Sequence, residues 1–441
     1  MKILFILPEY YPHSGGGIST YYEHYIKALL PHCDEIKVIV GSGYTQADNN
    51  FKHNGVLVEY LSPILYRQYL DKFTQYDLLP EYKNSLASAW AMWHQANQGQ
   101  DYDIVECTDF GLGFIPWVIE HNKPVITRLH GSYGQVMLHE NDSIADLSIP
   151  FTQQTELLTL KLCDKLVTHS KANSQYWDNL FGPNITRHIN PIYEKIGSPL
   201  PLSQRDKYGL ITARIQKWKG PIELCKAHEL LTDQPLIKWF GHDKAYNKYQ
   251  STDSYLREQF ASIWGKSILP QQPLPNNEIQ ALQQKAWFGV IPSTWDMFNF
   301  TCIEFMAAGT PIICSDGAGA GELIQNGING FKYPADNVQA LADCITKMTG
   351  LSEDGYHQMA KNALETIKTQ LSADKLIPIN MEVYQSAVND FKSAPSNPFL
   401  DSLYKPSSTK YDIGNILNKQ PLKKLINYSI DRIKLKISGK R

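Results

Sequence analysis

Residues 292–311 read PSTWDMFNFTCIEFMAAGTP, a stretch that joins a polar turn, the start of a helix and a tight return into a strand. Asp296 and Glu304 stand eight residues apart, one before the helix and one inside it. Backbone N–H groups of the first helical turn, around 299–302, have no partner within the helix and suit a phosphate. Glu304 is placed to accept hydrogen bonds from ribose hydroxyls, and Asp296 from hydroxyls of a sugar. Gly309 permits the turn that follows.

Strands and helices alternate on both sides of this stretch. The expected strands of the second half are 209–213, 237–240, 288–291 and 311–314, and its expected helices are 222–231, 278–285, 303–308 and 338–348. In the first half we expect strands 3–7, 36–40, 103–106, 124–128 and 165–169, and a helix over 18–30. Such alternation is typical of parallel sheets covered by helices.

A segment rich in proline and glycine, 191–201, separates the two alternations. The chain is therefore expected to be α/β, with two Rossmann-like, doubly wound domains that face each other across a cleft. Ligands of such sheets bind at the carboxyl ends of the strands. We divide the chain into a first domain, 1–195, a second domain, 196–376, a helix returning to the first domain, 377–394, and a linker with a basic tail, 395–441.

The charge is nearly balanced over the 441 residues, with 42 Lys and Arg against 44 Asp and Glu, a net of −2. This balance excludes a strongly basic nucleic-acid-binding protein and an acidic disordered one. Its distribution is uneven, because residues 419–441 carry a net +7 and leave −9 for the rest. The body is mildly acidic and the tail is basic.

Several features indicate a cytoplasmic protein. The seven cysteines form no CxxC pair, which argues against a disulfide framework or a zinc site. The N-terminal apolar run is short and is interpreted as a buried strand rather than a signal peptide. The sequence has no run of about 18 apolar residues that would span a membrane.

The central motif resembles the family 4 (group 1) retaining glycosyltransferases of the GT-B fold. Their hallmark is an acid, seven residues, then Glu-Ala-Met-Ala-x-Gly-x-Pro, and here Asp296 precedes the matching run 304–311. The resemblance continues through 315–324 and 326–330, covers about 1–390 and is strongest over 205–335. It implies that 1–195 is the acceptor-side domain and 196–376 the nucleotide-sugar-binding domain. Two positions depart from the family: Asp296 stands where Glu is usual, and Asn299 where Gly is frequent. Asparagine also tolerates unusual backbone angles.

A second match is the run TARIQKWKG at 212–220, which resembles the family's Gly-Arg, short loop and Lys-Gly. Arg214 can pair with a diphosphate through two parallel hydrogen bonds, and Lys219 adds a point charge. Taken alone, the run also fits a solvated basic turn. Beside the acid pair, it is expected to neutralise the leaving nucleoside diphosphate.

Further matches lie in the first half. His130 follows a strand, where the family has a His beside the donor sugar, and the loop 15–19 corresponds to one that approaches the diphosphate. Glu156 and the turn 168–171 also resemble the family, without a clear role. The expected catalytic residues are His130, Arg214, Lys219 and Asp296. The expected donor-binding residues are Gly16, Gly17, Arg214, Lys219, Asn299, Phe300, Thr301 and Glu304.

The resemblance implies transfer of a sugar from a nucleotide-diphosphate donor to a hydroxyl of a saccharide or lipid-linked saccharide, with retention, in surface polysaccharide or glycan biosynthesis. No cofactor and no metal are expected, and Asp101 and Asp103 are interpreted as a solvated edge. Because Asp296 departs from the family, a catalytically degenerate nucleotide-sugar-binding protein remains an alternative. A phosphorylase of similar fold is less favoured, because no motif for a pyridoxal-phosphate lysine is present.

The acceptor and the tail are less defined. Tyrosines are frequent in the first 110 residues, and 65–77 is expected to be an acceptor loop. In the tail, apolar residues recur at helical spacing between Lys and Arg, which is typical of a helix on anionic lipid. A solvated or self-packing tail is the alternative. Expected partners are thus the nucleotide sugar, the acceptor and, through 419–441, the inner face of the membrane, with no nucleic acid.

Overall fold

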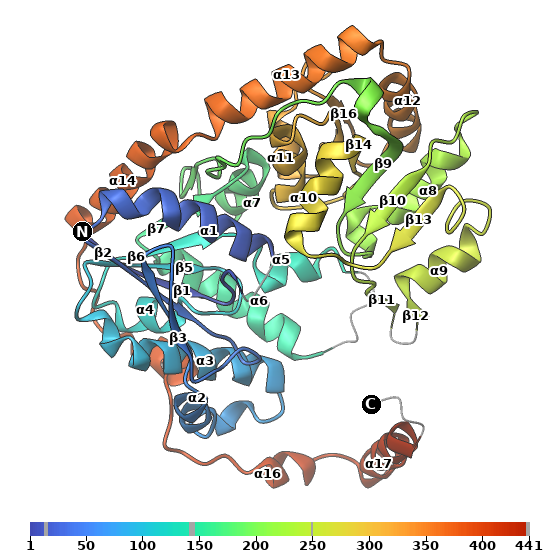
Figure 1. Ribbon diagram of the computed structural model, residues 1–441. Helices are drawn as coiled ribbons and strands as arrows, with labels where there is room; N and C mark the ends of the chain where they lie inside the picture. Colours follow the sequence, from blue (N-terminus) through green and yellow to red (C-terminus); the bar gives the residue numbers. More distant parts are fainter. Residues whose placement is uncertain (13–15, 141–145, 248–249, 438–441) are drawn as a thin grey trace.

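The computed structural model describes residues 1–12, 16–140, 146–247 and 250–437. It contains an eight-stranded sheet in the first half of the chain and a six-stranded sheet in the second. The first sheet lies at the lower left of Figure 1 and the second at the upper right, each covered by helices. The chain is therefore α/β with two parallel-sheet domains, and the expected fold class is confirmed.

The first sheet has the order β3-β4-β2-β1-β5-β6-β7-β8 and is parallel except for the β3–β4 pair. Its strands are β1 (Lys2–Leu7), β2 (Glu35–Val40), β3 (Asn50–His53), β4 (Val56–Tyr60), β5 (Ile104–Thr108), β6 (Val125–Leu129), β7 (Lys165–Thr168) and β8 (Thr186–His188). Five consecutive apolar residues of β1, from Ile3 to Leu7, are buried on both faces, as expected for a central strand covered by helices on both sides.

The helices of this half are α1 (Gly17–Leu29), α2 (Pro63–Leu70), α3 (Pro80–Gln95), α4 (Ile115–Glu120), α5 (Tyr133–Met137), α6 (Ser148–Thr159) and α7 (Lys171–Phe181). The prediction of an acceptor loop at 65–77 is wrong about its structure. It forms α2 and the 3-10 helix η2 (Thr74–Tyr76), which pack beside α3. The reason is its helical periodicity, since Tyr66, Tyr69, Phe73 and Tyr76 are all buried.

The second sheet has the order β13-β10-β9-β14-β15-β16, and all its pairs are parallel. Its strands are β9 (Asp206–Thr212), β10 (Ile237–Phe240), β13 (Ile268–Gln271), β14 (Ala286–Ile291), β15 (Ile312–Ser315) and β16 (Phe331–Tyr333). Its helices are α8 (Pro221–Glu229), α9 (Thr252–Gln259), α10 (Asn276–Lys285), α11 (Phe300–Ala307), α12 (Val338–Thr349) and α13 (Glu353–Gln370), and β11 (Ala245–Asn247) and β12 (Gln250–Ser251) form a separate hairpin.

After α13 the chain returns to the first half, as Figure 1 shows along its upper and left edges. Helix α14 (Ala373–Asp390) inserts Tyr384, whose hydroxyl donates to the buried Glu106 of β5 at 2.5 Å. Arg128 of β6 holds the same carboxylate through Nε at 2.7 Å and Nη2 at 2.8 Å. The amide oxygen of Asn380 in α14 accepts from Arg128 at 3.2 Å. This buried network attaches α14 to the first sheet.

Residues 398–411, expected as part of a linker, instead pack against the first half. Two side chains of the first half donate to backbone carbonyls of helix α15 (Pro398–Tyr404). Trp90 Nε1 donates to the carbonyl of Tyr404, and Tyr76 Oη to that of Leu403, both at 2.7 Å. The next residue, Lys405, pairs with Glu120 at 3.0 Å. Leu400, Leu403 and Tyr404 join the apolar core of the first half, which composition alone did not indicate.

Two helices close the chain, α16 (Ile413–Leu417) and α17 (Leu422–Ile437), and neither has a buried residue. Among the described residues, no helix is both long enough and apolar enough to cross a bilayer.

Candidate functional site

The turn before α11 is built around an asparagine in an unusual backbone conformation. Asn299 has φ 81° and ψ 89°, and its side-chain oxygen accepts from the backbone N–H of Cys302 at 3.2 Å as the helix cap. Asparagine is enriched at such positive φ values. This explains why Asn serves where the resembled family often has glycine. The helix begins at Phe300, three residues before the expected start at Ile303.

Asp296 and Lys219 contact each other directly. The Nζ of Lys219 lies 2.5 Å from Oδ2 of Asp296, and Nδ2 of Asn299 donates to the same oxygen at 2.8 Å. Both charged side chains are only 13% exposed. Burial lowers the pKa of Lys219, and the carboxylate of Asp296 opposes that shift. Two residues expected to touch different parts of a donor are therefore held together here.

Gly220, directly after Lys219, is required by packing. It has φ 77°, and a Cβ built on it would lie 1.7 Å from the carbonyl oxygen of Pro292. Any side chain would push the 216–220 turn away from the loop that carries Asp296. The Lys-Gly pair thus combines a cation with the close approach that brings it to the carboxylate.

Arg214 and Lys219 both lie over the indole of Trp218. The Cζ of Arg214 is 5.9 Å from the ring centroid and the Nζ of Lys219 is 4.1 Å from it. Arg214 is exposed, just beyond the end of β9. The hydroxyl of Thr301, in the first turn of α11, donates to the carbonyl of Thr212 at 3.1 Å. The two cations and the helix start therefore share the carboxyl edge of the second sheet.

Glu304 lies one turn further into α11 and has a partner that sequence reasoning missed. Its Oε2 accepts from Nε2 of Gln283 in α10 at 3.0 Å. Gln283 is buried. Burial raises the pKa of Glu304, and the Gln283 hydrogen bond opposes the increase. A polar residue four positions after Ile279, on the inward face of the predicted helix, is the signal that would have found Gln283.

His130 lies at the carboxyl end of β6. The backbone N–H groups of His130 and Gly131 donate to the carboxylate of Asp109 at 2.8 and 3.2 Å. The ring of His130 contacts those of Tyr21 and His169, with centroids 4.9 and 5.0 Å away. Its buried Nε2 has no hydrogen-bond partner among the described residues. Burial lowers the pKa of His130 well below its usual value, so the imidazole is neutral.

Asp109 was not expected, although it follows strand β5 as His130 follows β6. Burial raises the pKa of Asp109 to about 7, and the backbone N–H groups of His130 and Gly131 oppose that shift. A carboxylate that accepts two successive N–H groups fixes the course of the loop that carries His130.

The two halves meet around these residues. A Cβ built on Gly131 would lie 3.7 Å from the Trp295 ring and 3.8 Å from Cβ of Met297, so the His130 loop lies against the Asp296 loop. The ring of His139 stacks on Trp295 at 4.2 Å and an interplanar angle of 8°. Trp218 Nε1 donates to Glu140 at 2.8 Å.

The start of α1 also faces this region. Gly16 caps the helix and Gly17 begins it, while Gly15 lies outside the described residues. The backbone N–H of Ser19 donates to the Glu9 carboxylate at 3.1 Å, so an internal anion occupies part of this helix start. Helix α1 contacts α11, and the ring centroid of Tyr21 is 6.1 Å from that of Phe300.

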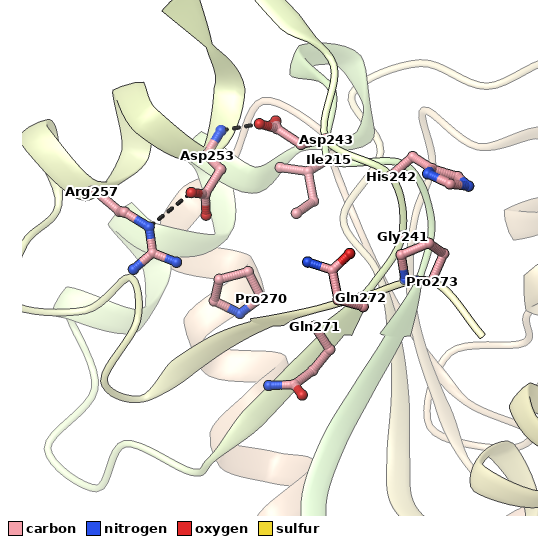
Figure 2. Close-up of a pocket in the computed structure, with 10 residues that line it drawn as sticks. All are labelled: Ile215, Gly241, His242, Asp243, Asp253, Arg257, Pro270, Gln271, Gln272 and Pro273. Atoms are coloured by element: carbon pink, nitrogen blue, oxygen red, sulfur yellow. Dashed lines mark hydrogen bonds and ion pairs between the residues drawn. The ribbon is translucent and has the colours of Figure 1, made fainter.

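A cavity of about 240 Å³ opens beside Ile215, at the carboxyl ends of β9, β10 and β13. Figure 2 shows its lining residues: Ile215, Gly241, His242, Asp243, Asp253, Arg257, Pro270, Gln271, Gln272 and Pro273. Asp253 is engaged on one side, because Arg257 Nε donates to it at 2.8 Å. Sequence reasoning did not single out this cavity, since four separate segments form it.

Comparison with known proteins shows what this chain is similar to. Residues 194–366 match the family model of the group 1 glycosyl transferases. An uncharacterized glycosyltransferase of Methanocaldococcus jannaschii is 24% identical over 423 residues, covering 88% of this chain and 99% of the relative. Sucrose-phosphate synthase from Thermosynechococcus elongatus superposes with a TM-score of 0.68 at 16% identity, covering 88% of this chain and all of that one. Anabaena HepE, in complex with UDP-glucose, gives 0.63 at 20% identity, with the same coverage.

Proposed function

We propose that this chain moves a sugar from a nucleotide-diphosphate donor to a hydroxyl of a saccharide or lipid-linked saccharide. Its residues 194–366 match the family model of the group 1 glycosyl transferases, and its fold is GT-B. The observation that carries the proposal is the cluster of Arg214, Lys219, Asp296 and the start of α11 at one sheet edge. A surface polysaccharide or another glycan is the proposed product.

The difficult step is departure of the diphosphate from the anomeric carbon. Arg214, Lys219 and the N–H groups at the start of α11 are suited to stabilise the charge that develops on it. Glu304 would hold the ribose hydroxyls and Asp296 the sugar hydroxyls. His130, kept neutral by burial, would hydrogen-bond the sugar through Nε2, which has no partner in the part of the chain that the structure describes.

For retention we propose attack on the face from which the diphosphate leaves. The bond from the anomeric carbon to the phosphate oxygen breaks, and the acceptor oxygen bonds to that carbon. The acceptor proton passes to the departing phosphate oxygen. No carboxylate has to act as a covalent nucleophile, and because Arg214 and Lys219 supply the positive charge, we propose that the reaction needs no metal ion.

We assign the base of the donor to the cavity beside Ile215. Because Arg214 directly precedes Ile215 in the chain, this position suits a nucleoside whose phosphates reach the two cations. Amides of Gln271 and Gln272 line it and offer both donors and acceptors to a base. HepE, one of the similar structures, is described in complex with UDP-glucose, which supports a nucleotide-sugar donor.

The test starts with UDP- and GDP-sugars, screened by thermal shift and then by hydrolysis and by transfer to saccharide acceptors. We expect Arg214→Ala or Lys219→Ala to lower kcat by about two orders of magnitude or more, as for loss of a group that stabilises leaving charge. Lys217→Ala is the matched control, because Lys217 lies in the same turn but over Tyr246.

Near-normal turnover in both variants would overturn the diphosphate assignment. Tight donor binding by the unmodified chain with neither hydrolysis nor transfer would instead favour a nucleotide-sugar-binding protein without catalysis.

A further inference from the structure

We propose that α17 is a membrane-binding helix that lies on a bilayer containing anionic lipid. Five apolar residues form one stripe along it: Leu422, Ile426, Ile430, Ile433 and Ile437, each between 45 and 82% exposed. Their spacing of three or four residues places them on a single face of the helix. Exposed apolar surface of this extent marks an interaction site.

The charges around the stripe match an anionic surface. At 100° per residue, Lys423 and Lys434 fall on one flank of the stripe and Lys436 on the other, while Arg432 and Lys424 fall further round the helix. Such cations reach toward lipid headgroups while the apolar face sinks between the acyl chains. The one acid of α17, Asp431, falls on the opposite side.

This charge pattern also favours a bilayer over a second copy of the chain. Pairing two stripes face to face would bring the flanking lysines of both copies close together, and like charges that lie close together repel. Residues 1–418 carry a net −9, so the same anionic surface that attracts the tail repels the body. The tail alone is therefore expected to touch the membrane.

The segment that precedes α17 is attached to the first half of the chain. Besides the contacts of α15, the backbone N–H of Ser407 donates to the carbonyl of Lys72 at 2.9 Å, and that of Tyr411 to Oγ1 of Thr74 at 3.1 Å. Residues up to Tyr411 thus follow the surface of the first half, and α17 lies beyond them, apart from both sheets in Figure 1. The membrane is therefore placed on the α2–α3 side of the first half.

The proposal is tested with the full chain and sedimented vesicles, one set of phosphatidylcholine alone and one also containing phosphatidylglycerol. The unmodified protein is expected to sediment with the second set. The triple substitution Ile426→Gln, Ile430→Gln and Ile433→Gln, or the pair Lys423→Glu and Lys434→Glu, should weaken this binding by about tenfold or more. Tyr428→Gln, on the opposite side of α17, is the control and should leave it unchanged.

Equal sedimentation of the triple variant and the unmodified chain would overturn the proposal, as would equal binding to both kinds of vesicle. A dimer in light scattering that the triple variant breaks, with no vesicle binding, would replace the membrane by a second copy of the chain. No donor is present in these measurements, so their failure is separate from failure of the proposed transfer reaction. The thermal midpoint should not change, because α17 buries no residue.

Discussion

At the residue scale, the contact between Lys219 and Asp296 shapes the site. The side chain of Lys219 is only 13% exposed, and its amine already has a carboxylate partner at 2.5 Å. A diphosphate that binds this amine must therefore compete with Asp296 or share the amine with it. Sharing would orient Asp296 beside the sugar, next to the bond that breaks. The shorter arm of Asp, compared with the Glu usual in the family, is compatible with this because Gly220 brings the lysine turn so close.

A pH-dependent prediction concerns Glu156, a carboxyl that is almost fully buried. Burial raises the pKa of Glu156 to about 8; the Ser132 hydroxyl and the N–H of Gly134 oppose the shift, and nearby Asp109 adds to it. The unfolded chain loses this proton near pH ~4.3. The stability that Glu156 contributes is thus present at low pH and is lost as the pH rises toward 8.

Glu156→Gln keeps an oxygen for Gly134 and removes this charge. The free energy of unfolding of the variant should gain on the unmodified chain by up to about 1.4 kcal/mol per pH unit within that window. Urea unfolding of both proteins at pH 5 and pH 8 measures the change. A difference that stays constant between the two pH values would contradict the prediction.

At the scale of elements, the attachment of α14 depends on a buried ion pair. Arg128 and Glu106 are almost fully buried, and Tyr22, Tyr384 and Asn380 supply further hydrogen bonds to the pair. A buried charge without its partner is costly, whereas a neutral pair of similar size is tolerated. The network therefore stabilises the docked position of α14 only while it is complete.

Arg128→Met is expected to lower the free energy of unfolding by about 3–5 kcal/mol, because it leaves Glu106 buried and uncompensated. Adding Glu106→Gln should recover part of that loss. Chemical denaturation measures both variants, and Arg187→Met, at an exposed arginine of β8, is the control. A double variant less stable than Arg128→Met alone would contradict this explanation.

At the scale of the whole molecule, the two halves are held together beside the site. The carboxylate of Glu322, in the second half, accepts the backbone N–H groups of Lys171 and Ala172 at 2.9 Å each. These groups form the start of α7 in the first half. Gly319 approaches Ser170 so closely that a Cβ on it would lie 2.6 Å from Cβ of Ser170. The structure thus shows the halves in contact around His130 and Asp296.

Glu322→Ala should loosen this contact. An acidic side chain at a helix start contributes about 1 kcal/mol, so we expect KM for the donor to rise roughly fivefold with kcat little changed. Small-angle scattering without donor should show a larger radius of gyration. Glu353→Ala, at an exposed glutamate in the first turn of α13, is the control. An unchanged radius together with an unchanged KM would show that Glu322 does not hold the halves together.

The sequence by itself determined the alternation of strands and helices, the two sheets and the glycosyltransferase motif. These features follow from local periodicity and from the run of twenty residues at 292–311, and both can be recognised in the sequence alone. Strand β13 was missed because it is short and contains Pro270, and β16 because it has only three residues. Helix α2 was taken for a loop although its buried tyrosines recur at helical spacing.

Only the tertiary structure decided which side chains meet. Gln283 reaches Glu304 from another helix, Asp109 holds the His130 loop from another strand, and Lys219 contacts Asp296 across 77 positions of sequence. The packing of 398–411 against the first half is likewise a contact between segments that lie far apart in the sequence. Such contacts depend on how sheets and loops pack in space. A local pattern of residues does not predict a partner that lies far along the chain.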